Sequence, residues 1–84
     1  MEEVFILKVE KAGDDGLSFD AVPFRDEEAA MAEAKARADV FKDEIVREYK
    51  KGTFIEDYKP TSLYVATDWS MSLYIFCKVT KHVL

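Results

Sequence analysis

Residues 71–81 read MSLYIFCKVTK, and this stretch alternates more regularly than any other in the chain. One side of the alternation is apolar throughout, with Leu73, Ile75, Cys77 and Val79. The other side is mixed, with Ser72, Tyr74, Phe76, Lys78 and Thr80. A period of two predicts a β-strand. A sheet with one face in water usually alternates cleanly between apolar and polar residues, so the aromatic side chains of the mixed side need an explanation.

Three further segments alternate in the same way: residues 3–11, 17–24 and 62–67. The first two flank Gly13-Asp14-Asp15-Gly16, whose residue types are typical of a tight hairpin turn. Pro23 lacks a backbone N–H, so we expect it at a strand end or on a sheet edge. Residues 53–61 are ambiguous, because they fit either a short strand or a packed loop.

Residues 26–51 predict one long helix. Asp26 is the expected N-cap or first-turn residue, and Glu27 and Glu28 follow it beside the positive end of the helix dipole. Gly52 is the residue expected just past the C-cap. Apolar residues at spacings of three and four predict the buried stripe: Met31, Ala34, Ala38, Phe41, Ile45 and Tyr49.

This order predicts a single α+β domain over residues 1–84, with the topology ββαββ. Short connections favour a four-stranded antiparallel sheet with the one long helix packed on one face. We expect the helix to cover the odd-numbered strand residues: Phe5, Leu7, Val9, Leu17, Phe19, Leu63, Val65, Leu73, Ile75, Cys77 and Val79.

The even-numbered strand residues form the second face, which one helix cannot also cover. Several are large and apolar: Val4, Ile6, Val22, Phe24, Tyr64, Tyr74 and Phe76. In one interpretation, residues 53–61, the C-terminal tail or the twist of the hairpins covers this face. In the favoured one, a second subunit or another protein covers it, because exposed apolar patches usually mark interaction sites. We therefore predict a protein-binding surface around Tyr64, Tyr74 and Phe76.

Charge points to a protein partner as well. The 84 residues contain 12 basic and 17 acidic side chains, and the net charge of -5 argues against direct nucleic-acid binding. Acidic residues are concentrated in the first half of the chain, and we expect several of them near one end of the domain. The predicted electrostatic contacts are Asp14, Asp15, Glu27 and Glu28, a negative patch that could occupy a basic groove meant for nucleic acid.

The sequence offers little chemistry. Cys77 is the only cysteine and His82 the only histidine, and an odd spacing puts them on opposite faces of one strand. No metal-binding or phosphate-binding motif is present, so we expect no catalytic residues, no metal site and no cofactor. The absence of a signal-like segment and of a long apolar run predicts a cytoplasmic protein without membrane contact.

The resulting functional hypothesis is a small acidic, non-enzymatic protein-interaction module. It would act as an inhibitor or regulator that occupies the surface of a larger partner, of a second copy of itself in a homodimer, or of both. In type it resembles phage or plasmid inhibitors of nucleic-acid-binding host proteins. The alternative is a homodimeric ligand-binding or enzymatic α+β protein, with a pocket between the helix and residues 54–58.

Overall fold

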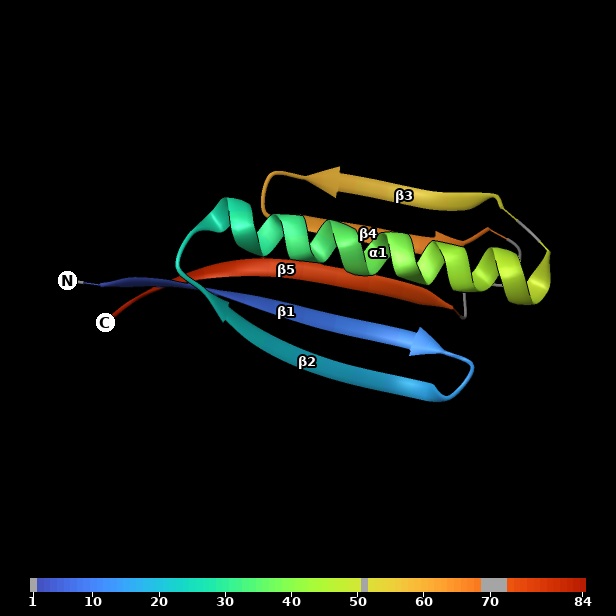
Figure 1. The fold of residues 1–84 in the computed structure, drawn as a ribbon, viewed down its shortest axis with the longest axis horizontal. Helices are drawn as coiled ribbons and strands as arrows, with labels where there is room; N and C mark the ends of the chain where they lie inside the picture. Colours follow the sequence, from blue (N-terminus) through green and yellow to red (C-terminus); the bar gives the residue numbers. More distant parts are fainter. Residues whose placement is uncertain (1, 51, 69–72) are drawn as a thin grey trace.

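The computed structural model describes residues 2–50, 52–68 and 73–84. Along the chain, the elements are β1 (Glu3–Gly13), β2 (Gly16–Phe24), α1 (Glu27–Tyr49), β3 (Phe54–Lys59), β4 (Ser62–Thr67) and β5 (Tyr74–Val83). All five strands form one antiparallel sheet in the order β2-β1-β5-β4-β3. The helix α1 lies along one face of this sheet, and the two chain ends lie side by side (Figure 1).

The predicted α+β class is confirmed, but the predicted four-stranded ββαββ sheet is wrong by one strand. Residues 54–59 form the additional strand β3, which pairs with β4 from Phe54 opposite Thr67 to Lys59 opposite Ser62. β3 is a short edge strand with three charged residues among its six, a composition that obscures the apolar alternation and is common at sheet edges. Because β3 pairs edge to edge with β4, it widens the sheet and leaves the second face uncovered.

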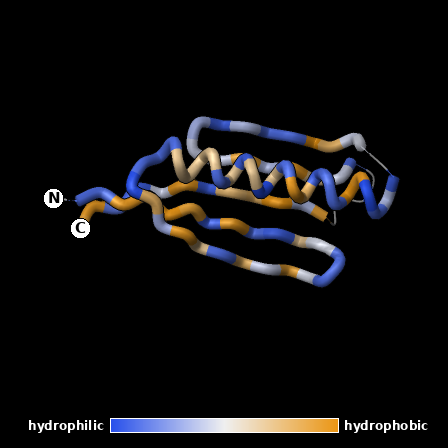
Figure 2. Tube along the Cα trace, viewed as in Figure 1, coloured by the Kyte–Doolittle hydropathy of each residue, from blue (hydrophilic) through white to orange (hydrophobic). Residues whose placement is uncertain are grey.

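The core lies between α1 and the sheet. The helix contributes Ala30, Ala34, Ala38, Phe41 and Ile45, and the strands contribute Leu7, Val9, Leu63, Val65, Ile75, Cys77 and Val79. The predicted helical stripe is therefore confirmed, with Met31 and Tyr49 half-buried at its margins. Alanines in the first half of the stripe allow the helix to approach the sheet closely. Hydrophobic residues are spread along β1, β2 and β5, and hydrophobic and hydrophilic residues alternate along α1 (Figure 2).

The expected helix-facing set is wrong for β2. Gly13 pairs with Gly16 across a two-residue turn, so odd residues of β1 lie opposite even residues of β2. Leu7 pairs with Val22 and Phe5 with Phe24, which places Val22 and Phe24 on the helix side. Leu17 and Phe19 therefore lie on the second face. Gly16 has a φ of 104°, a conformation that side chains disfavour, which explains the glycine at the end of this turn.

Of the two predicted ends of α1, the structure confirms the N-terminal one only. Asp26 is the N-cap, and its carboxylate accepts a hydrogen bond from the Ala29 N–H at 2.7 Å, as expected. At the other end the C-cap is Lys50, in the left-handed region with a φ of 58°, and its N–H donates to the Val46 carbonyl. The expectation that Gly52 lies just past the C-cap is therefore wrong by one residue.

Candidate functional site

The face of the sheet opposite α1, here called the open face, has no other described element packed on it (Figure 1). The strand registers place its side chains in transverse rows, because directly paired residues point to the same side. The aromatic row runs from β2 to β3 and consists of Phe19, Glu10, Phe76, Tyr64 and Asp57. The lysine row is the next one along the strands and consists of Ala21, Lys8, Lys78, Ser62 and Lys59.

The rows on either side of these two are mostly apolar. Beyond the aromatic row lie Leu17, Ala12, Tyr74, Ala66 and Ile55. Beyond the lysine row lie Pro23, Ile6 and Thr80. The open face is therefore an apolar surface crossed by one band of charged side chains.

Large apolar side chains on this face remain accessible to water. Phe19 is 70% exposed, Leu17 57%, Ile55 42% and Phe76 37%. Phe19 and Phe76 line a shallow hollow of about 510 Å³ together with Lys8, Glu10 and Lys78. A hollow with aromatic walls and charged side chains around it is typical of a surface that another molecule fills.

The structure brings the predicted apolar contacts together. Tyr64 and Phe76 are direct cross-strand neighbours, and the rings of Tyr64 and Tyr74 lie 6.0 Å apart. Tyr64 and Tyr74 are half-buried, and the Tyr74 hydroxyl donates to the Glu10 carboxylate. This hydrogen bond raises the pKa of Tyr74. Both rings are therefore held in place, whereas Phe76 and Phe19 are more accessible.

Sequence reasoning missed three of the most exposed residues of this face: Leu17, Phe19 and Ile55. The signal for the first two was present in Gly13-Asp14-Asp15-Gly16. Across a two-residue turn, each odd-numbered residue pairs with an even-numbered one. The odd residues of β2 therefore lie on the same face of the sheet as the even residues of β1. Ile55 was missed because β3 was not recognised as a strand.

The predicted acidic contacts do not gather at one end of the molecule, so that expectation is wrong. Asp14 and Asp15 lie at the tip of the β1–β2 hairpin, where Asp14 accepts a hydrogen bond from the Tyr49 hydroxyl at the end of α1. This bond raises the pKa of Tyr49 to about 12. Glu27 and Glu28 lie in the first turn of α1, at the other end of β2, a strand that spans about 30 Å (Figure 1).

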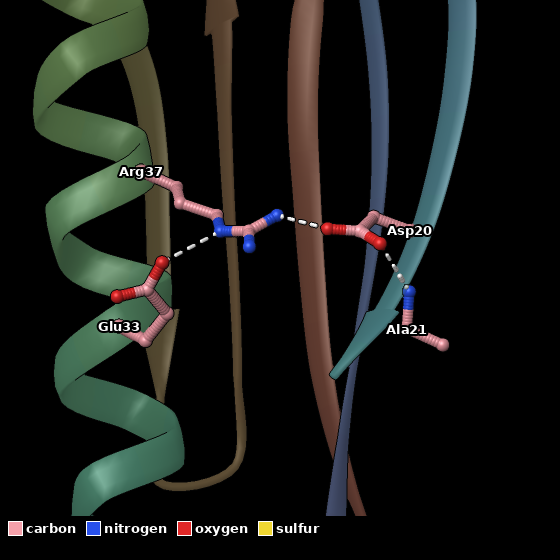
Figure 3. A network of polar contacts seen from close by, with 4 residues as sticks. All are labelled: Asp20, Ala21, Glu33 and Arg37. Carbon is pink, nitrogen blue, oxygen red and sulfur yellow. Dashed lines mark hydrogen bonds and ion pairs between the residues drawn. The ribbon is translucent and has the colours of Figure 1, made fainter. Parts of the chain in front are cut away.

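Ion pairs fasten the helix to β2. The Arg37 guanidinium contacts Asp20 of β2 at 2.7 Å and Glu33 of the helix at 2.8 Å (Figure 3). Hydrogen bonds to Glu33 and Asp20 raise the pKa of Arg37, and the bond from Arg37 lowers the pKa of Asp20. The Asp20 carboxylate also accepts from the Ala21 N–H at 2.9 Å.

A second set fastens the helix to β3. Lys42 contacts Glu56 at 2.9 Å, and the Tyr58 hydroxyl donates to the same carboxylate oxygen at 2.6 Å. Bonds from Tyr58 and Lys42 lower the pKa of Glu56, and the bond to Glu56 raises the pKa of Lys42. Ion pairs thus join both outer strands to α1. The charged groups that form them lie on the helix side of the sheet and pair with each other.

The free edge of β2 is partly blocked. Since Gly13 and Gly16 close the turn as a pair, residues 18, 20 and 22 direct their backbone groups to β1, and residues 17, 19, 21 and 23 direct theirs outward. Pro23 has no N–H to offer, and the Ala21 N–H is bonded to Asp20. Pro23 lies on an edge strand near its end, as expected. Addition of a further strand here is therefore disfavoured beyond residue 19.

The remaining candidates for chemistry lie apart. Cys77 is buried under α1, and burial raises the pKa of its thiol to about 11, whereas His82 is exposed on the opposite face. Within the described residues, no group of three or more potential metal ligands occurs. A hollow of about 670 Å³ lies between α1 and β3, where the alternative hypothesis expects a pocket, and its charged residues include the paired Lys42 and Glu56.

Comparisons with protein-family models, with curated proteins and with solved structures find no match to this chain. In the part of the chain that the structure describes, no helix has the length and apolar character needed to cross a membrane. The open face is therefore the feature from which a function can be argued.

Proposed function

We propose that this chain is a non-enzymatic protein-interaction module that docks another protein on the open face of its sheet. Such a module acts as an inhibitor or regulator by occupying its partner's surface. The observation that carries the proposal is the exposure of Phe19 and Phe76, at 70% and 37%, on a sheet face over which no described element packs. Covering each 100 Å² of such a surface contributes about 2.5 kcal/mol before ordering costs.

The face itself, rather than a strand edge, supports docking. The edge of β2 offers few free N–H groups, because Pro23 lacks one and Asp20 holds that of Ala21. The other edge strand, β3, carries Glu56, Asp57 and Lys59. Both features are ones that proteins use to discourage strand addition.

A protein fits this face better than a nucleic acid. A single-stranded nucleic acid would stack its bases on the aromatic row and place its phosphates near the lysines. Glu10 and Asp57 lie within that row, so their carboxylates would repel the phosphate backbone. The net charge of -5 adds to this repulsion.

The proposal is tested by capture with three matched baits: the parent chain, the variant F19S/F76S and the variant V40S/V46S. Val40 and Val46 are 55% and 42% exposed on α1, so the second variant removes comparable apolar surface away from the open face. We expect one protein, either the chain itself or another, to bind the parent and V40S/V46S but not F19S/F76S. The same set of proteins on all three baits would overturn the proposal.

A further inference from the structure

We infer that the partner seated on the open face is a second copy of this chain, packed face to face as a two-sheet sandwich. The two-fold axis would lie across the strands, between the aromatic row and the lysine row. This inference rests on the proposed function and names its partner. Three observations carry it: the order of charges along the strands, the unpaired lysines, and the distribution of charge between the two layers.

The charges are arranged so that the face is complementary to itself. On β1, Glu10 belongs to the aromatic row and Lys8 to the lysine row. On β3, Asp57 and Lys59 repeat the same order. An axis between the rows exchanges them, so each carboxylate of one copy lies over the lysine of the same strand in the other copy. Symmetric interfaces require this kind of self-complementarity.

The apolar side chains match under the same operation. Phe76 of one copy lies over Lys78 of the other, a cation–π arrangement, and Phe19 lies over the small Ala21. The sheets then pack with their strands aligned, which is the usual geometry of a β-sandwich. An axis along the central strand β5 would instead place Lys78 of one copy over Lys78 of the other and leave Glu10 and Asp57 without opposing lysines, so it is disfavoured.

The two lysines at the centre have no ion-pair partner among the residues that the structure describes. Lys8 and Lys78 are direct cross-strand neighbours, and neither forms an ion pair with any residue that the structure describes. Asp57 and Lys59 do contact each other, at 3.6 Å, but both side chains remain more than half exposed. All four residues are therefore available to a second copy.

The layers of the molecule differ in charge. The strand side chains of the open face include three lysines and two carboxylates, although the whole chain has a net charge of -5. The negative charge thus lies outside this face, and two copies of an acidic chain repel each other least when their open faces meet.

The size of the face is sufficient for a dimer. Strands about 4.8 Å apart and rows about 6.8 Å apart, three of them across five strands and one across three, give a face of roughly 590 Å². Two such faces bury on the order of 1,200 Å², the lower bound of specific, stable interfaces.

The test uses two charge-reversed full-length chains and sedimentation equilibrium. E10K/D57K makes both rows of the open face basic, and K8E/K59E makes both acidic. Each variant alone should be monomeric, with a dissociation constant raised about tenfold or more over the parent. An equimolar mixture should form a heterodimer, because every carboxylate again faces a lysine. Far-UV circular dichroism verifies that both variants are folded.

A monomeric parent chain at high micromolar concentration overturns the inference, whatever the variants do. Dimerisation of either variant alone, or a mixture that stays monomeric while the parent dimerises, overturns the proposed two-fold arrangement. Failure of the dimer leaves the proposed function standing if the capture experiment still finds a protein that depends on Phe19 and Phe76. Failure of both experiments removes both proposals.

Discussion

Lys8 and Lys78 lie directly opposite each other on β1 and β5, at the centre of the open face. Like charges in this position destabilise a sheet. The relationship therefore costs the isolated chain stability, and it is explained if Lys8 faces a carboxylate and Lys78 an aromatic ring of a docked partner.

Replacing Lys78 by Thr should separate these two effects. In the F19S/F76S background, which we expect to be monomeric, Lys78→Thr should raise the free energy of unfolding by about 0.5 kcal/mol, because it removes the repulsion and adds a β-branched residue. In the parent background it should weaken association. Urea unfolding and sedimentation measure the two quantities. Lys59→Thr is the control, since Lys59 already contacts Asp57 and its loss relieves no repulsion.

The Asp20–Arg37 ion pair predicts a pH dependence. Arg37 holds the pKa of Asp20 below its ordinary value of 3.8, so the bond contributes stability that is present above this value and is lost as the pH falls through the lowered pKa. Asp20→Asn should lower Tm at pH 7, and this deficit should shrink between pH 4 and pH 2. Thermal unfolding across this range is the measurement. A deficit that is the same at pH 2 and pH 7 would show that the charge is irrelevant.

The alanines beneath α1 predict a strong dependence on side-chain size. Ala34 is fully buried against the sheet, whereas Ala32 is exposed on the same helix. Ala34→Leu should cost about 1–3 kcal/mol by forcing the helix away from the sheet. Ala32→Leu should change stability by less than about 0.5 kcal/mol. Urea midpoints compare the two, and equal midpoints would contradict the close helix–sheet contact.

The left-handed C-cap predicts a stabilising substitution. Lys50 adopts a φ of 58° without the freedom of glycine. Lys50→Gly should raise the free energy of unfolding by about 0.5–1 kcal/mol, because the strain relieved exceeds the added entropy of the unfolded chain. Thermal unfolding would measure this gain. Arg47→Gly, within the last helical turn, should instead destabilise by about 1 kcal/mol.

The helix and its buried stripe could be predicted from the sequence, because spacings of three and four have one structural meaning. The N-cap at Asp26 followed from residue type and position. The C-cap could not be predicted in the same way, since Lys50 takes a conformation that residue preferences assign to glycine.

The open face was predicted only in part. Tyr64, Tyr74 and Phe76 followed from the alternation within β4 and β5. Placing Phe19 on this face requires knowing that odd residues of β1 pair with even residues of β2. That pairing follows from the hairpin turn and cannot be read from the alternation within one strand. The acidic residues lie at opposite ends of the molecule because the whole length of β2 separates Asp14 and Asp15 from Glu27 and Glu28. Their closeness in the sequence did not indicate this separation.

The measurement that tests the central claim most directly is hydroxyl-radical footprinting of the open face. The chain is oxidised in an extract of the cells that produce it, and again as purified protein at nanomolar concentration. We predict that Phe19 and Phe76 are oxidised several-fold more slowly in the extract, while Leu84, 74% exposed near the chain end, reacts equally in both. Equal oxidation of Phe19 and Phe76 under both conditions would contradict the claim that a protein covers this face.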